Sequence, residues 1–115
     1  MYFDSHAHLD DARFDGDREE IFSTLQAHGV GGIMNVGCDL PSSERSVALA
    51  ERYPFVWAAV GSHPDDADHV DGRLLDRYRA LAAQPKVKAI GEIGLDYHYE
   101  DVPRAQQIIA FEQLL

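Results

Sequence analysis

Four short apolar stretches recur along the chain at similar intervals. They occupy residues 1–5, 32–36, 56–60 and 87–90. Their starts lie 24 to 31 positions apart, close to the roughly 30 residues of a β-α-β unit. The second and third stretches are apolar almost throughout, as is typical of strands that are covered on both faces. The pattern therefore predicts four strands of a parallel sheet.

Helical patterns fill the segments that separate these stretches. Acidic residues within 17–20 suit the first turn of a helix, and Gly29 suits its C-terminal cap. The other predicted helices begin near Pro41, Gly72 and Pro103. The last of them carries an apolar stripe formed by Ile108, Ile109, Phe111, Leu114 and Leu115.

Predicted strands and helices alternate four times with no linker, low-complexity segment or change of composition. We therefore expect a single α/β domain over residues 1–115. About four βα units in 115 residues amount to slightly under half of a (β/α)8 TIM barrel, which takes about 250 residues. We expect the first half of such a barrel, truncated, with its C-terminal half absent.

Candidate reactive residues gather where the predicted strands end. They are His6, His8, Cys38, Asp39, His63, Glu92 and Asp96. A TIM barrel builds its active site from the loops at this end of its strands. An open doubly wound sheet also binds ligands there, but no glycine-rich loop follows the first predicted strand.

Composition limits the function further. The chain has 10 Lys and Arg against 20 Asp and Glu, a formal net charge of −10, which opposes nonspecific binding to nucleic acid but allows a carboxylate-rich metal site. The single cysteine, Cys38, excludes an intrachain disulfide and is expected to be a small packing residue. No apolar run approaches the roughly 20 residues of a membrane span, and the N-terminus lacks a signal-peptide pattern, so we expect a cytoplasmic protein with no membrane partner.

A metal site is the main chemical hypothesis. His6 and His8 are two positions apart, so in a strand both imidazoles project from the same face. Glu92 follows the fourth predicted strand. Imidazole pairs suit Zn, Mn, Fe or Ni, and a carboxylate can bridge two ions. The alternatives are a surface histidine pair and a buried Glu92 that pairs with Lys88.

Three further residues are candidates for supporting roles. His63 lies in a rigid Gly-Ser-His-Pro turn, where it suits contact with a substrate phosphate or carboxylate. Asp96 is expected to be brought beside Glu92 by the turn at Gly94, as a substrate-binding residue. Asp4 is either an acceptor that orients a ligating histidine or an ordinary acid at a strand end.

The chain resembles the TatD family of metal-dependent deoxyribonucleases, part of the amidohydrolase superfamily of (β/α)8 barrels. Four motifs in order carry this resemblance: Asp4-Ser5-His6-Ala7-His8-Leu9, Asn35-Val36-Gly37, Gly61-Ser62-His63-Pro64 and Gly91-Glu92-Ile93-Gly94-Leu95-Asp96-Tyr97. The resemblance implies a hydrolase that cuts DNA phosphodiester bonds from a 3′ end. It also implies divalent metal ions, two in the full-length protein, with Mg, Mn or Zn as candidates.

The resemblance further implies roles for individual residues. His6 and His8 resemble the paired ligands of one ion, and Glu92 resembles the catalytic carboxylate that bridges two. His63 looks like the histidine near the substrate. The family pattern adds two histidines and an aspartate from later strands, which lie beyond Leu115. We therefore expect this chain alone to be inactive and to self-associate through exposed half-barrel edges.

Two other functions stay open from the sequence. One is a different amidohydrolase-type enzyme that acts on an amide or lactone, although several of these carry a carbamylated lysine where Glu92 stands. The other is a non-catalytic binding or assembly fragment.

Overall fold

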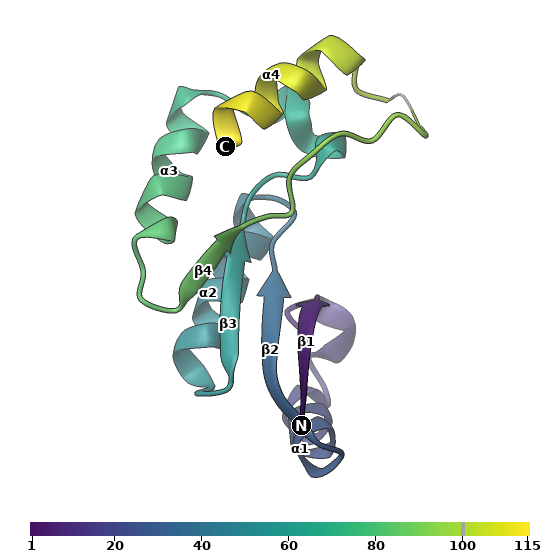
Figure 1. Ribbon diagram of the computed structural model, residues 1–115, viewed down its shortest axis with the longest axis vertical. Helices are drawn as coiled ribbons and strands as arrows, with labels where there is room; N and C mark the ends of the chain where they lie inside the picture. The colour runs from purple at the N-terminus through teal and green to yellow at the C-terminus, as the bar shows by residue number, and fades with distance from the viewer. Residues whose placement is uncertain (100) are drawn as a thin grey trace.

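The structure is a computed structural model that describes residues 1–99 and 101–115, and its centre is a parallel sheet (Figure 1). The strands follow one another in the sheet in the order in which they occur in the chain. They are β1 (Tyr2–Ala7), β2 (Val30–Val36), β3 (Val56–Val60) and β4 (Val87–Ile90). The predicted alternation of strands and helices is therefore confirmed.

Helices follow each strand at the positions that the sequence predicts. They are α1 (Arg18–Ala27), α2 (Leu40–Arg52), α3 (Gly72–Ala82) and α4 (Arg104–Leu114). Aspartates begin two of them, since Asp39 accepts a hydrogen bond from the Ser42 amide and Asp71 from the Leu74 amide. Two 3-10 helices were not predicted, η1 (Ala12–Phe14) and η2 (Pro64–His69).

The main core lies between the sheet and helices α1 to α3, with α1 and α2 behind the sheet in Figure 1. Ile33, Val56 and Val60 are fully buried in it. The edge strand β1 is more open: Tyr2 is 73% exposed and Phe3 55%. The radius of gyration, 14.8 Å, exceeds the roughly 13 Å of a compact chain of this length, which agrees with a sheet that is covered mainly on one side.

Helix α4 packs against the 3-10 helix η2. It lies at the end of the sheet to which the strands point (Figure 1), over a small core of Ala67, Val102 and Ala110. Its buried residues are Gln107, Ala110 and Leu114, while Ile108 and Ile109 are 41% and 56% exposed and Leu115 is 82% exposed.

A buried amide fixes the orientation of α4. The Gln107 side chain accepts a hydrogen bond from the Asp96 amide at 2.8 Å and donates to the carbonyls of Asp96 and Val102 at 2.9 Å. These bonds turn the Gln107 face of the helix inward and leave Ile108, Ile109 and Leu115 exposed. None of the helices in the described ranges is both long and apolar enough to cross a membrane.

Candidate active site

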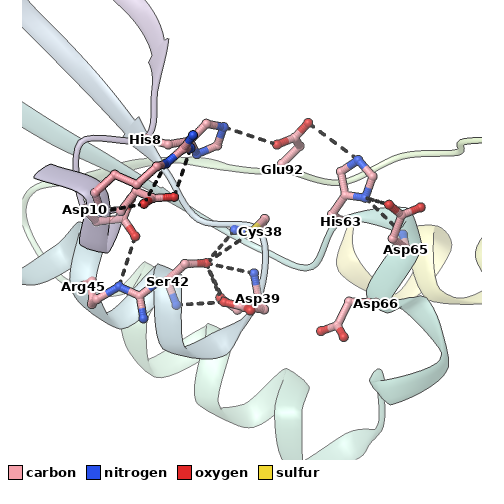
Figure 2. Close-up of a pocket in the computed structure, with 12 residues that line it drawn as sticks. His8, Asp10, Cys38, Asp39, Ser42, Arg45, His63, Asp65, Asp66 and Glu92 are labelled. Atoms are coloured by element: carbon pink, nitrogen blue, oxygen red, sulfur yellow. Dashed lines mark hydrogen bonds and ion pairs between the residues drawn. The ribbon is translucent and has the colours of Figure 1, made fainter.

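Three histidines and one glutamate meet at the carboxyl end of the sheet. His6 and His8 come from the end of β1, His63 follows β3 and Glu92 follows β4. Glu92 Oε2 lies 3.5 Å from His6 Nε2 and 3.8 Å from His8 Nε2. Its other oxygen, Oε1, faces His63 Nε2 at 3.9 Å, so the carboxylate stands between His8 and His63 (Figure 2). The structure thus brings together four of the residues that the sequence places at strand ends.

Two imidazole nitrogens and one carboxylate oxygen form a cluster that fits a divalent ion. His6 Nε2 and His8 Nε2 are 3.1 Å apart, and Glu92 Oε2 completes the triangle. A point equidistant from these three atoms lies about 2.0 Å from each, which matches zinc–ligand distances of about 2.0–2.2 Å. The side chains are 51%, 43% and 32% exposed, so solvent and ligands can reach the cluster.

Hydrogen bonds to β2 orient His8. Its Nδ1 lies 2.8 Å from the Val36 carbonyl oxygen, which only accepts, so Nδ1 carries the proton of the neutral ring. The lone pair on Nε2 therefore faces His6 and Glu92. The neighbouring Leu9 amide donates to Asn35 Oδ1 at 2.7 Å, which fixes the backbone beside His8 as well.

Asn35 is the centre of a buried polar network beside the cluster of His6, His8 and Glu92. It is fully buried in β2, and its Nδ2 donates to Asp10 Oδ1 at 2.9 Å and to Ser46 Oγ at 2.8 Å. Asp10 in turn accepts from Arg45 Nε at 3.1 Å. No sequence motif pointed to a role for Asp10, Arg45 or Ser46. A polar Asn35 inside an apolar strand was the signal that could have revealed the network.

His63 has its own fixed orientation. It is the N-cap of η2, and its Nδ1 accepts a hydrogen bond from the Asp65 amide at 3.0 Å. In the neutral ring the proton must then be on Nε2, the nitrogen that faces Glu92. His63 therefore presents a hydrogen-bond donor to the space beside the carboxylate.

Tyr78 in α3 anchors the segment that leads to His63. Its hydroxyl donates to the Gly61 carbonyl at 3.0 Å and lies 2.7 Å from Ser62 Oγ. Burial raises the pKa of Tyr78 to about 12, because the phenolate would lose its hydration. Ser43 Oγ accepts from the Gly61 amide at 3.1 Å, so α2 and α3 both hold this turn.

A pocket of about 520 Å³ opens beside the cluster (Figure 2). Its lining comprises His8, Asp10, Asp11, Arg13, Cys38, Asp39, Ser42, Arg45, His63, Asp65, Asp66 and Glu92. The volume falls within the roughly 300–1,000 Å³ of small-molecule sites. At its rim the hydrogen-bonded Arg13 guanidinium lowers the pKa of Asp11, and Asp11 raises the pKa of Arg13.

Other sequence candidates lie outside this pocket or act differently. Asp96 is not among the residues that line it, and its carboxylate accepts from the His98 amide at 3.0 Å. Asp4 accepts from the backbone amide of His6 at 3.1 Å, so it holds the chain rather than the ring. The ion pairs of Glu92 join it to three histidines, and Cys38 is partly buried at the pocket wall.

Comparison with known proteins connects this site to one family. A family model described as TatD-related DNase matches residues 3–115. A Bacillus subtilis protein named as the uncharacterised metal-dependent hydrolase YabD is 42% identical over 104 residues, which are 90% of this chain and 41% of that protein. The 3′-5′ ssDNA/RNA exonuclease TatD of Cronobacter turicensis is 38% identical over 113 residues, 98% of this chain and 43% of that protein.

Solved structures agree with these relatives. The Escherichia coli TatD homologue YJJV superposes with a TM-score of 0.88 at 32% identity, over 98% of this chain and 44% of that one. An uncharacterised amidohydrolase from Saccharomyces cerevisiae has a TM-score of 0.85 at 18% identity, over 99% of this chain and 42% of that one, which shows a shared fold. The chain therefore spans less than half the length of the relatives it matches, and its fold corresponds to the N-terminal portion of a TatD barrel.

Proposed function

The chain belongs to the family of TatD-related DNases, and on that basis we propose that it supplies part of the active site of a divalent-metal-dependent nuclease. The reaction is hydrolysis of a phosphodiester bond at the 3′ end of single-stranded DNA. The named activity of the Cronobacter turicensis relative supports this choice of substrate. The observation that carries the proposal is the triangle of His6 Nε2, His8 Nε2 and Glu92 Oε2, whose edges suit a single ion.

In this proposal His6, His8 and Glu92 hold the first ion. The tautomer of His8 supports its part, because the proton on Nδ1 leaves Nε2 free to bind. Glu92 turns Oε1 toward His63, which suits a carboxylate that bridges to a second ion. Mg, Mn and Zn are the candidate ions, and when bound they would lower the pKa of a water and neutralise charge on the phosphoryl oxygens.

His63 and Glu92 then have distinct tasks toward the substrate. His63 Nε2–H donates to a phosphate oxygen placed beside Glu92, and the N-cap bond to Asp65 keeps the ring in that tautomer. Glu92 acts as the catalytic carboxylate because it faces both the paired histidines and His63. Asp96 lies on the loop that follows Glu92, where its backbone is hydrogen-bonded to the Gln107 side chain. In this proposal it contacts the substrate.

The acidic character of the chain is compatible with a nucleic-acid substrate in this scheme. A net charge of −10 repels phosphates in bulk, so affinity has to come from local positive charge. Divalent ions held by His6, His8 and Glu92 would supply that positive charge. Binding is then expected to depend on the metal more than on surface lysines and arginines.

A chimera tests the nuclease proposal. Residues 1–115 replace the matching portion of the Cronobacter turicensis exonuclease, of which they cover 43%. The purified chimera is incubated with Mn²⁺ and single-stranded DNA labelled at its 5′ end, beside the 115-residue chain alone. We expect stepwise 3′ shortening by the chimera, loss of it in His8→Ala and Glu92→Gln, full activity in His28→Ala, and no cleavage by the chain alone.

The same experiment separates the competing functions. Metal-dependent DNA binding without cleavage, in a chimera with native circular dichroism, would replace the enzyme by a binding module. Hydrolysis of an amide or lactone, with DNA left intact, would point to another amidohydrolase-type enzyme. Equal cleavage by the parent chimera and His8→Ala would show that the paired histidines are not part of the site.

We also propose that residues 1–115 form one domain that associates with a second copy of itself. Strands β1 and β4 end the described sheet, and each pairs with one neighbour there. Tyr2, Phe3 and Ile90, on these strands, are 73%, 55% and 42% exposed. Unpaired edges and exposed apolar side chains favour strand pairing between copies. Sedimentation velocity across a concentration series tests this, since a species that stays at 12.8 kDa would contradict it.

A further inference from the structure

The pocket beside Glu92 differs in charge from one side to the other. Asp10 and Arg45 lie on the side of His8, whereas Asp65 and Asp66 lie on the side of His63 (Figure 2). Arg45 and Arg13 are the two cations in the lining, and both carry an aspartate partner. A second anion that enters the pocket is therefore repelled least on the side of Arg45.

The Arg45 guanidinium is hydrogen-bonded through Nε, and its two terminal nitrogens face solvent. Its Nε donates to Asp10 Oδ2 at 3.1 Å, and the Asp10 side chain is only 5% exposed. The Arg45 side chain is 54% exposed, and within the described residues its two terminal nitrogens have no hydrogen-bond partner. Asn35 Nδ2 donates a hydrogen bond to Asp10, so the carboxylate that binds the Arg45 guanidinium is itself held in place.

Arg13 is arranged differently at the same pocket. Both its Nε and its Nη2 donate to the carboxylate of Asp11, at 3.1 and 3.2 Å, and its side chain is 83% exposed. One edge of its guanidinium is thus already occupied by a carboxylate. Arg45 is the better anchored cation, and its free edge carries the pair of N–H groups that matches two oxygens of a phosphate.

We propose that Arg45 binds a second phosphate of the substrate, the one next along the strand from the phosphodiester beside Glu92. This inference rests on the proposed nuclease function. It gives the strand a path across the pocket, from Glu92 past His8 to Arg45 and away from Asp65 and Asp66. The proposal also predicts that a nucleoside with two phosphates binds more tightly than a nucleoside with one phosphate.

Nucleotide binding to the 115-residue chain tests this without any cleavage. Thymidine 3′,5′-bisphosphate and the two thymidine monophosphates are titrated in Mg²⁺, with affinities from ¹⁵N-resolved NMR shifts. We expect the bisphosphate to bind about tenfold more tightly than either monophosphate, as suits one added charge-assisted contact. The Arg45 Nε–Hε signal should move with the bisphosphate and hardly at all with the monophosphates.

Matched variants identify the residue responsible. Arg45→Gln should reduce the tenfold preference to less than twofold, and Arg45→Lys should keep part of it because the charge stays but the fork is lost. Arg52→Gln removes the same charge from the far end of α2, where Arg52 pairs with Glu19, and should keep the full preference. Equal binding of all three nucleotides to the parent chain, or a preference that survives Arg45→Gln, would overturn the proposal.

Failure of this inference can be told apart from failure of the nuclease proposal. An inactive chimera together with an Arg45-dependent preference would refute the nuclease and support the phosphate site. An active chimera together with a preference that does not depend on Arg45 would refute the phosphate site alone.

Discussion

Replacing Asn35 by alanine should destabilise the whole domain, because its buried amide serves three partners at once. It accepts from the Leu9 amide at 2.7 Å and donates to Asp10 at 2.9 Å and to Ser46 at 2.8 Å. Two neutral hydrogen bonds at about 1 kcal/mol each and one to a carboxylate at about 1.5–3 kcal/mol add to a loss of about 3–5 kcal/mol. That is a large part of the roughly 5–15 kcal/mol of a typical domain.

Urea denaturation followed by circular dichroism measures this loss. With a slope of about 1–3 kcal/mol per molar urea, the midpoint should fall by about 2 M. Ser46→Ala, which removes one partner of Asn35, should cost only about 1 kcal/mol and keeps the test informative if Asn35→Ala fails to fold. Gln26→Ala, on the exposed face of α1, should stay within about 0.5 kcal/mol of the parent. A loss below about 1 kcal/mol in Asn35→Ala would refute the idea that the network stabilises the site.

Two further predictions concern the segments that hold the site. Burial raises the pKa of Tyr78 to about 12, so the folded state disfavours the phenolate. The contribution of the neutral side chain to the free energy of unfolding is therefore fully present below pH 10 and is lost as pH rises toward 12. Between pH 9 and 12, urea denaturation should show that the free energy of unfolding of the parent falls by about 2 kcal/mol more than that of Tyr78→Phe. The same pH dependence of unfolding free energy in the two proteins would contradict this. Gly37→Ala would place its Cβ 2.7 Å from the Ser43 Cα, a backbone atom, so it should cost about 1–3 kcal/mol in the same assay. Gly16→Ala, with nothing within 4 Å, is the control, and equal stability of the two variants would rule out the close packing of Gly37 on α2.

The order of elements was predictable because it depends on local pattern. The spacing of apolar stretches gave the strands, and the positions of proline and aspartate gave the helix starts. The assembly of His6, His8, His63 and Glu92 was also predictable, since parallel strands bring their carboxyl ends to the same edge of a sheet. These inferences need no knowledge of side-chain packing.

The parts that were missed depend on tertiary hydrogen bonds. The Val36 carbonyl that orients His8 has no signature in sequence, because every residue carries a carbonyl. The orientation of α4 follows from Gln107, whose amide bonds to the backbone of Asp96 and Val102 and leaves Ile108 and Ile109 exposed. Arg45 could not be linked to Asp10, 35 positions away, without the contact between α2 and the loop after β1.

Titration of the purified chain with Zn²⁺ or Mn²⁺ in a calorimeter tests the metal centre most directly. The parent chain should bind an ion through His6, His8 and Glu92, and His6→Ala, His8→Ala and Glu92→Gln should each weaken binding by roughly 100-fold or more. His28 lies away from this cluster, with its ring bonded to the Thr24 carbonyl at the end of α1, so His28→Ala should bind as the parent does. Equal affinity in all five proteins, or no binding to the parent, would contradict the assignment of this cluster as the metal centre.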